Sequence, residues 1–161
     1  SLHAINNMKK VSNNNFKKSL SKFSTGVTII AIKSRNNVIG KTVNSFTSLS
    51  LSPPLILFTL SKKSTSLNRF KSSLYLSINI LNKNQKNVSI NFAKKNSQWG
   101  SIDFIEGKFK TPMIKGCVSN LECKIKKLIP QGDHIIFICK VMNIINNDKE
   151  KPLTYFNSKY S

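Results

Sequence analysis

Residues 40–66, GKTVNSFTSLSLSPPLILFTLSKKSTS, decide how this chain folds. The stretch begins with polar side chains at a glycine turn, passes through Pro53 and Pro54 into the apolar run at 55–58, and ends in hydroxyls and lysines. A proline pair favours a turn, and a short apolar run favours a buried strand. The stretch therefore predicts two strands joined by a proline-fixed turn, with polar groups where the chain enters and leaves the sheet.

The polar ends of this stretch allow two interpretations. An anionic, partly aromatic ligand would explain them, with its phosphate at residues 61–66, because lysine supplies a point charge and hydroxyls with turn N–H groups supply oriented donors. A strand followed by a solvated serine-rich turn explains the same residues. From the turn alone, the solvated turn is the simpler interpretation.

One further segment, residues 23–28, bears on this choice when it is taken together with the quoted stretch. Residues 23–28 (FSTGVT), residues 40–48 (GKTVNSFTS) and the Pro53-Pro54-Leu55 that follows closely resemble the flavin reductase-like family. The resemblance runs from about Phe16 to Tyr160 with its pieces in the family's order, which is far more specific than any one motif. It implies a mainly β fold, an antiparallel FMN-binding split β-barrel with a few short flanking helices. Residues 16–161 would form this single domain, after an N-terminal extension at 1–15.

The composition is that of an ordinary globular protein with an unusual charge. At 161 residues, with 39% apolar and 9% aromatic residues, the chain suits one domain with a moderate core. Its formal net charge of +20 invites a nucleic-acid interpretation. The lysines are scattered along the whole length, however, and Arg35 and Arg69 are the only arginines. Compositional drift explains the charge better, and it leaves a positive field that attracts anionic ligands.

Cysteine and histidine usage argues against a metal site. Cys117, Cys123 and Cys139 form no Cys-x-x-Cys pair, and the only histidines are His3 and His134. A zinc site needs ligands at closer, repeated spacing, and a secreted disulfide scaffold has a denser, even cysteine count. We therefore expect no metal, buried free thiols and a cytoplasmic protein.

The N-terminal residues carry no targeting signal that we recognise. Residues 1–15 lack the apolar core of a signal peptide, and no apolar run approaches the length of a membrane span. We expect no membrane association. Met8 is a candidate natural start, which would make residues 1–7 an addition.

Hydrophobic periodicity predicts several strands with interspersed short helices. Helices are expected at 16–23, 65–70 and 84–92, and strands at 27–32, 38–46, 55–60, 74–81, 121–129, 134–145 and 152–156. The first helix would be capped at residues 13–15, and the first turn of the second would carry serines and free N–H groups for a phosphate. The chain shows no repeated strand–helix–strand unit, which favours an antiparallel barrel.

Two segments carry more specific expectations. Residues 74–81 alternate apolar and polar side chains, which predicts a strand with one polar face formed by Tyr75, Ser77 and Asn79. Residues 94–113 are the least regular part of the chain, and Trp99 and Phe104 would anchor them.

Any chemistry must come from a cofactor. Six carboxylates, two histidines and no cysteine beside a second polar motif leave little for a triad or a carboxylate pair. By resemblance, the isoalloxazine ring and ribityl chain of FMN would lie along Thr42, Val43, Asn44 and Ser45. The phosphate and ribityl end would lie at Thr59, Leu60, Ser61, Lys62, Lys63, Ser64 and Ser66. Taken singly, Asn44 reads as a turn residue, and Lys62 and Lys63 read as solvated lysines.

The motif Gly132-Asp133-His134 recurs in the family near the nicotinamide. By this resemblance His134 is the catalytic candidate, placed to contact the carboxamide or the charge that develops during hydride transfer. A lone histidine after a turn also serves structural roles. Weaker nicotinamide-side candidates are Ser24, Thr25, Gly26, Tyr155 and Tyr160, although tyrosines in a terminal strand usually pack.

Three departures from the family pattern limit the transfer of roles. Lys41 and Val43 stand where many relatives carry small or apolar residues and alanine, which would alter flavin contacts or selectivity. Ser52 replaces a frequent acidic residue before the proline pair, and Cys139 replaces a frequent glycine. None of these changes removes a catalytic group, because the protein mainly positions two cofactors.

The resemblance implies an NAD(P)H-dependent flavin reductase. Its flavin would be FMN, with FAD as the alternative, and its co-substrate NADH or NADPH. Relatives usually form homodimers and supply reduced flavin to a monooxygenase component. A non-catalytic FMN-binding carrier or sensor is the alternative function, and a basic nucleic-acid-binding domain ranks last.

Overall fold

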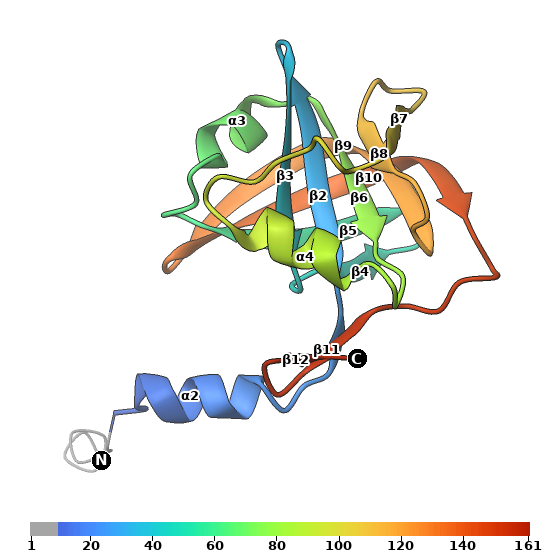
Figure 1. Ribbon diagram of the computed structural model, residues 1–161. Coiled ribbons are helices and arrows are strands. Elements are labelled where there is room, and N and C mark those ends of the chain that lie inside the picture. Colours follow the sequence, from blue (N-terminus) through green and yellow to red (C-terminus); the bar gives the residue numbers. More distant parts are fainter. Residues whose placement is uncertain (1–9) are drawn as a thin grey trace.

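The computed structural model describes residues 10–161, and its largest feature is one antiparallel sheet (Figure 1). Its strand order is β3-β2-β6-β9-β10-β5-β4. The protein is thus mainly β, and its fold is an antiparallel split barrel with a few short helices. The expectations for residues 1–7 and for Met8 lie outside the described residues. The strands of the sheet are β2 (Thr28–Ser34), β3 (Asn37–Val43), β4 (Thr47–Ser50), β5 (Leu55–Ser61), β6 (Tyr75–Ile80), β9 (Ser119–Gln131) and β10 (His134–Asn146).

Smaller elements surround this sheet. A three-stranded sheet has the order β1-β11-β12, and β7 pairs with β8. The helices are α2 (Asn13–Leu20), α3 (Leu67–Ser72) and α4 (Lys86–Ala93). The remaining strands are β1 (Thr25–Gly26), β7 (Phe104–Glu106), β8 (Pro112–Ile114), β11 (Thr154–Phe156) and β12 (Lys159–Tyr160).

Strand β5 shows why the proline-to-apolar stretch organises the core. Ile56, Phe58 and Leu60 alternate with half-buried neighbours and are all buried. The Phe58 ring stacks on Phe137 of β10, with centroids 4.9 Å apart. Burying such aromatic side chains removes a large apolar area from water. The predicted strand at 55–60 is confirmed. The antiparallel pairing of β5 with β10 places the end of β5 beside the start of β10.

The strand predicted at 74–81 is present as β6, and its polar face is buried rather than open to water. Ser77 and Asn79 of β6 are fully buried. The Ser77 hydroxyl donates to the Pro112 carbonyl, and the Asn79 side chain accepts from the backbone N–H of Ile114 at 2.9 Å. Strand β8 therefore covers this face of β6. Alternation alone does not distinguish water from a covering strand, because both satisfy polar groups.

The first predicted helix is shifted in the sequence. It spans Asn13–Leu20, and its N-cap is Ser12, whose hydroxyl accepts from the Asn15 N–H, so the prediction of a cap at residues 13–15 is wrong. Helix α2 lies away from the main sheet (Figure 1). The apolar residues Phe16, Leu20 and Phe23 are 55%, 57% and 77% exposed. Phe23 lies beyond the helix, so the prediction of three residues on one helical face is also wrong.

The predicted helix at 65–70 begins later than expected. Helix α3 starts at Leu67 with Ser66 as its N-cap, and the Ser66 side chain makes no capping hydrogen bond. The serines therefore lie in the preceding loop, and the prediction that they occupy the first helical turn is wrong. The third predicted helix is present as α4.

The segment at 94–113 is more regular than expected, because it contains β7, which pairs with β8 at the end of the segment. Trp99 anchors the segment: its ring centroid lies 4.6 Å from that of Phe92 on α4 and 5.1 Å from that of Phe104. These ring contacts hold the segment against α4. Short strands of this kind carry too few residues for a periodicity signal.

All three cysteines are buried and free, as expected. Burial raises the pKa of Cys117 and of Cys139 to about 12, so both thiols stay protonated at neutral pH. Within residues 10–161, no cluster of His, Cys, Asp and Glu side chains is arranged to hold a metal ion. Nor do the described helices include one with the length and apolarity of a membrane span.

Candidate functional site

The end of β3, the end of β5 and the start of β10 meet at one cavity. His134, the first residue of β10, pairs with Ser61, the last residue of β5. The cavity has a volume of about 260 Å³. It is lined by Lys41, Thr42, Val43, Asn44, Ser45, Thr59, Leu60, Ser61, Ser64 and His134. The structure therefore brings most of the predicted flavin residues together with the predicted catalytic histidine.

A side-chain clasp joins the two predicted flavin segments. The Ser45 hydroxyl accepts from the Thr59 backbone N–H at 3.0 Å and donates to the Thr59 carbonyl at 3.3 Å. Ser45 lies beyond the end of β3, and Thr59 lies within β5. This reciprocal pair holds the 42–45 segment beside the strand that leads to Ser61.

Asn44 occupies a central position in this region. It lines the cavity just described and two adjoining cavities of about 200 Å³ and 560 Å³. Its side chain is exposed and makes no hydrogen bond to another residue in the described range 10–161. An amide offers both donors and acceptors. Asn44 is therefore available to a ligand, and the interpretation of its side chain as one that satisfies a turn is not supported.

The loop at 61–66 is ordered by its own backbone. The Lys63 N–H donates to the Ser61 hydroxyl at 3.1 Å, and the Ser64 N–H donates to the Ser61 carbonyl at 3.0 Å. The Lys62 N–H donates to the carbonyl of Asp133 at 2.9 Å, which ties the loop to the turn before β10. Of the predicted phosphate residues, Lys62, Lys63 and Ser66 do not line the cavity.

His134 is held by its neighbour in the chain. Its Nδ1 lies 2.7 Å from the Asp133 carboxylate, and its side chain is 46% exposed at the cavity wall. The hydrogen bond with His134 and its charge lower the pKa of the Asp133 carboxyl. A carboxylate on Nδ1 orients the ring and leaves the other ring nitrogen for a ligand.

The predicted nicotinamide-side residues lie in the two adjoining cavities. Ser24, Thr25 and Gly26 line the larger one, and Tyr155 and Tyr160 line the smaller one. The Thr25 hydroxyl oxygen is buried and has no hydrogen-bond partner in the described part of the chain. Such a group is uncommon in proteins and is satisfied when a ligand brings a polar atom to it.

The tyrosines also support the flavin-side segment. The Tyr160 hydroxyl lies 2.8 Å from the Ser89 hydroxyl, and the Ser89 carbonyl accepts from the Thr42 hydroxyl at 2.6 Å. The rings of Tyr155 and Tyr160 lie 5.1 Å apart between centroids. The C-terminal strands are thus connected through α4 to the predicted flavin position Thr42.

Several cavity residues are absent from the predicted site. Lys41 donates from Nζ to the Thr65 hydroxyl at 2.8 Å, and burial lowers the pKa of this lysine. Its place beside Thr42 in the quoted stretch is the signal that pointed to it. Of the others, Phe23, Val27, Thr28, Phe46 and Thr47 lie in the two segments that carry the family resemblance, whereas Ile80 and Ala93 come from segments whose sequence pattern marks only strand or helix.

The donor set suits a phosphorylated aromatic ligand. Ser45, Ser61 and Ser64 line the cavity with hydroxyls, the Asn44 amide has no partner in the described part of the chain, and Val43 and Leu60 supply apolar wall. An apolar wall with a few convergent polar groups is typical of cofactor sites. The fold and this site together define an antiparallel split-barrel protein of the flavin-binding class.

Comparison with known proteins identifies the family. The family described as flavin reductase like domain matches residues 20–161, and the chain belongs to it. The FMN reductase (NADH) SmoA of Agrobacterium fabrum is 31% identical over 140 residues, which cover 87% of this chain and 80% of that protein. The NADH:FAD oxidoreductase SgcE6 of Streptomyces globisporus, solved with NAD and FAD fragments, superposes with a TM-score of 0.89 at 28% identity and 96% coverage of both chains.

A third relative points to a wider assembly. The reductase subunit HsaB of a flavin-dependent monooxygenase from Mycobacterium tuberculosis is 30% identical over 149 residues, which cover 91% of this chain and 80% of that protein. The similarity therefore extends over most of both chains.

Proposed function

We propose that this protein is an NADH-dependent flavin reductase that binds FMN in the cavity at Asn44. One observation carries the proposal: residues 42–45, 59–61 and 64 line a single cavity with His134, and the Asn44 amide there has no hydrogen-bond partner within residues 10–161. The relatives named above act with NADH on FMN or FAD. The strong positive charge of the chain favours any phosphorylated ligand and so does not distinguish NADH from NADPH. The choice of NADH rests on the relatives alone.

The residues of the chain bind and orient the two cofactors. FMN, when bound, supplies the acceptor for a hydride from the nicotinamide. Asn44 and the Thr42 and Val43 backbone would hold the ring end, while Ser61 and Ser64 would hold the phosphate end, with Lys63 adding positive charge outside the cavity lining. Thr25 and the tyrosine pair line the two adjoining cavities, where the nicotinamide would lie. Catalysis then rests on proximity and orientation, with His134 near the developing charge.

Titration of the purified protein with FMN, followed by NADH and NADPH oxidation, tests this function. Asn44→Ala should weaken FMN binding by about tenfold, because a polar contact to the ligand is lost. The matched control is Asn96→Ala, an exposed amide that lines none of the site cavities. FMN binding without NADH oxidation would favour a carrier or sensor. Absence of flavin binding would reject both functions.

We further infer that the protein forms a homodimer through α2. Phe16 and Leu20 on this helix and Phe23 after it are more than half exposed, although large apolar side chains are normally buried. A second copy would cover them. Sedimentation of the wild type and of Phe16→Ser/Leu20→Ser should give a dimer and a monomer, respectively, and a monomeric wild type would contradict the inference.

The remaining features of the proposal concern context. Delivery of reduced flavin to a monooxygenase component is supported by relatives that are reductase subunits of such enzymes. A cytoplasmic location is supported by the three buried free thiols. The reductase domain would span residues 16–161, close to the residues matched by the family.

A further inference from the structure

Lys41 brings a positive charge to the wall of the proposed flavin site. Among residues 10–161, it is the only lysine or arginine that lines the cavity at Asn44 or either of the two adjoining cavities, and no aspartate or glutamate in this range lines them. The chain as a whole carries 26 lysines and arginines. The basic composition of the chain is therefore represented in the described site by a single side chain.

The Lys41 side chain bridges the two ends of the main sheet. Lys41 lies on β3, at one end of the strand order, whereas the 61–66 loop begins at the last residue of β5, next to the other end. Its Nζ donates to the Thr65 hydroxyl of that loop at 2.8 Å. An ammonium group has three N–H donors, so two remain for a ligand. The charge of Lys41 is thereby held beside the loop at which the flavin phosphate is proposed to bind.

The charge of Lys41 is not balanced by the described part of the protein. Within residues 10–161 it forms no ion pair with a carboxylate, and its hydrogen-bond partner, the Thr65 hydroxyl, is neutral. Burial lowers the pKa of Lys41, because its surroundings disfavour the charged form. An anion brought to this place would stabilise the ammonium group through a charge-assisted hydrogen bond.

The 61–66 loop offers hydroxyls to the cavity without a charge. Ser61 and Ser64 line the cavity, whereas Lys62 and Lys63 are exposed and do not. A solvated lysine contributes little to binding, because water and salt screen its charge. A phosphate held by the two serines alone would therefore lack a counter-charge in the cavity.

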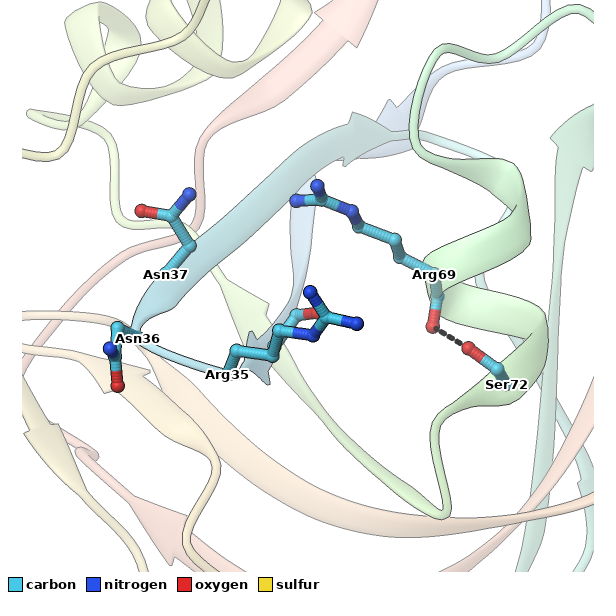
Figure 2. Close-up of a pocket in the computed structure, with 6 residues that line it drawn as sticks. Arg35, Asn36, Asn37, Arg69 and Ser72 are labelled. Carbon is cyan, nitrogen blue, oxygen red and sulfur yellow. Dashed lines mark hydrogen bonds between the residues drawn. The ribbon is translucent and has the colours of Figure 1, made fainter.

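The two arginines of the chain lie at a different cavity. Figure 2 shows the side chains of Arg35 and Arg69 extending into one space, Arg35 from the β2–β3 turn and Arg69 from α3. This cavity has a volume of about 600 Å³ and shares no lining residue with the cavity at Asn44. The arginines therefore add to the general positive field of the chain without lining the flavin site.

We propose that Lys41 binds the phosphate of FMN through its ammonium group, so that the site selects phosphorylated flavin over riboflavin by this contact. The inference rests on the proposed function, because it takes the flavin to lie along Asn44. Ser61 and Ser64 donate hydroxyls to the same phosphate, and Thr65 positions the lysine.

The test measures the affinities of the full chain for FMN and for riboflavin, which has the same ring and ribityl chain without the phosphate. In Lys41→Met, the ratio of FMN to riboflavin affinity should fall by about tenfold, because charged hydrogen bonds to the phosphate are lost. Riboflavin affinity should stay as in the wild type, which also shows that the ring site of the variant is intact. Lys41→Arg keeps the charge and should keep most of the ratio. Thr65→Val should lower the ratio by a smaller factor than Lys41→Met.

The controls Lys71→Met and Arg69→Gln each remove one positive charge at an exposed position that lines none of the three site cavities. They should leave the ratio within about twofold, because solvent screens distant charges. An unchanged ratio in Lys41→Met, with FMN still bound, overturns the role of Lys41 while the proposed function stands. A fall of equal size in Lys63→Met assigns the charge to the loop and also overturns it. A wild type that binds neither flavin rejects the proposed function together with this inference.

Discussion

The Ser45 hydroxyl and the Thr59 backbone exchange two hydrogen bonds, accepting from the N–H at 3.0 Å and donating to the carbonyl at 3.3 Å. The residues are separated by the proline turn, yet this contact brings both proposed flavin segments to one cavity wall. A side chain that satisfies both backbone groups of one residue replaces the ladder hydrogen bonds that a neighbouring strand would supply.

Ser45→Ala should therefore weaken FMN binding and lower the free energy of unfolding by about 1 kcal/mol, since the Thr59 N–H and carbonyl lose their partner. Fluorescence titration and urea denaturation measure the two effects. Ser48→Ala, at an exposed position of β4, is the control and should change neither. FMN affinity equal to that of the wild type in Ser45→Ala would show that the clasp does not shape the site.

His134→Ala should reduce the kcat of NADH oxidation by about 10- to 100-fold, because one polar group near the reacting atoms is lost. FMN affinity should change much less, since the flavin phosphate is proposed to bind at the 61–66 loop. Asp133→Asn keeps the imidazole and removes only its carboxylate partner, so the kcat of this variant should lie between those of the wild type and His134→Ala. Steady-state kinetics measure this, and equal kcat values for His134→Ala and the wild type would assign His134 a structural role.

Gly40→Ala should destabilise the fold by about 1–3 kcal/mol through overpacking. A β-carbon at Gly40 would stand 2.8 Å from a Phe92 ring atom and 3.1 Å from a Trp99 ring atom. The Phe92 ring has little room to move, because it is fully buried. Thermal denaturation measures the effect against Gly100→Ala, where no atom lies within 4 Å. Equal stability of the two variants would mean that α4 shifts freely on β3.

Glu122→Gln should cost about 2–3 kcal/mol of unfolding free energy at neutral pH, as expected when a buried charged acceptor is lost. The fully buried Glu122 carboxylate accepts from the Phe109 N–H, the Thr111 hydroxyl and the Asn143 amide. A glutamine amide nitrogen in this place meets donors only. Urea denaturation measures the loss, with Glu150→Gln as the control. A loss no larger than that of the control would contradict this role.

The same carboxylate predicts a pH dependence of stability. Burial acts to raise the pKa of Glu122, but the hydrogen bonds outweigh it and hold the pKa below the ordinary 4.5. The folded state therefore favours the ionised form, and this stabilisation is full above pH 4.5 and is lost as the pH falls through the lowered folded pKa. Unfolding free energies measured from pH 7 to pH 3 should fall in the wild type, and less steeply in Glu122→Gln. If the unfolding free energies of the wild type and Glu122→Gln fall in parallel with pH, other groups cause the loss of stability in acid.

Much of the fold and of the site follows from local patterns. The strand at 55–60 was predictable because its apolar alternation and the preceding prolines are properties of adjacent residues. The flavin segment at 42–45 was recognisable through its order with FSTGVT and the proline pair. The cap of α2 could not be predicted in this way, because Ser12 and Asn13 are equally good caps in sequence and one hydrogen bond decides between them.

The sequence by itself determined the family, through motifs that keep their order along the chain, and the longer strands, whose patterns depend on neighbours within a few positions. Only the tertiary structure decided which polar groups share a space. It buried Ser77 and Asn79 under β8, left the Asn44 amide unbonded between three cavities, and brought Arg35 to the same cavity as Arg69. Contacts of this kind join residues far apart in the chain, and their geometry is set by strand register and helix packing, which no local pattern encodes.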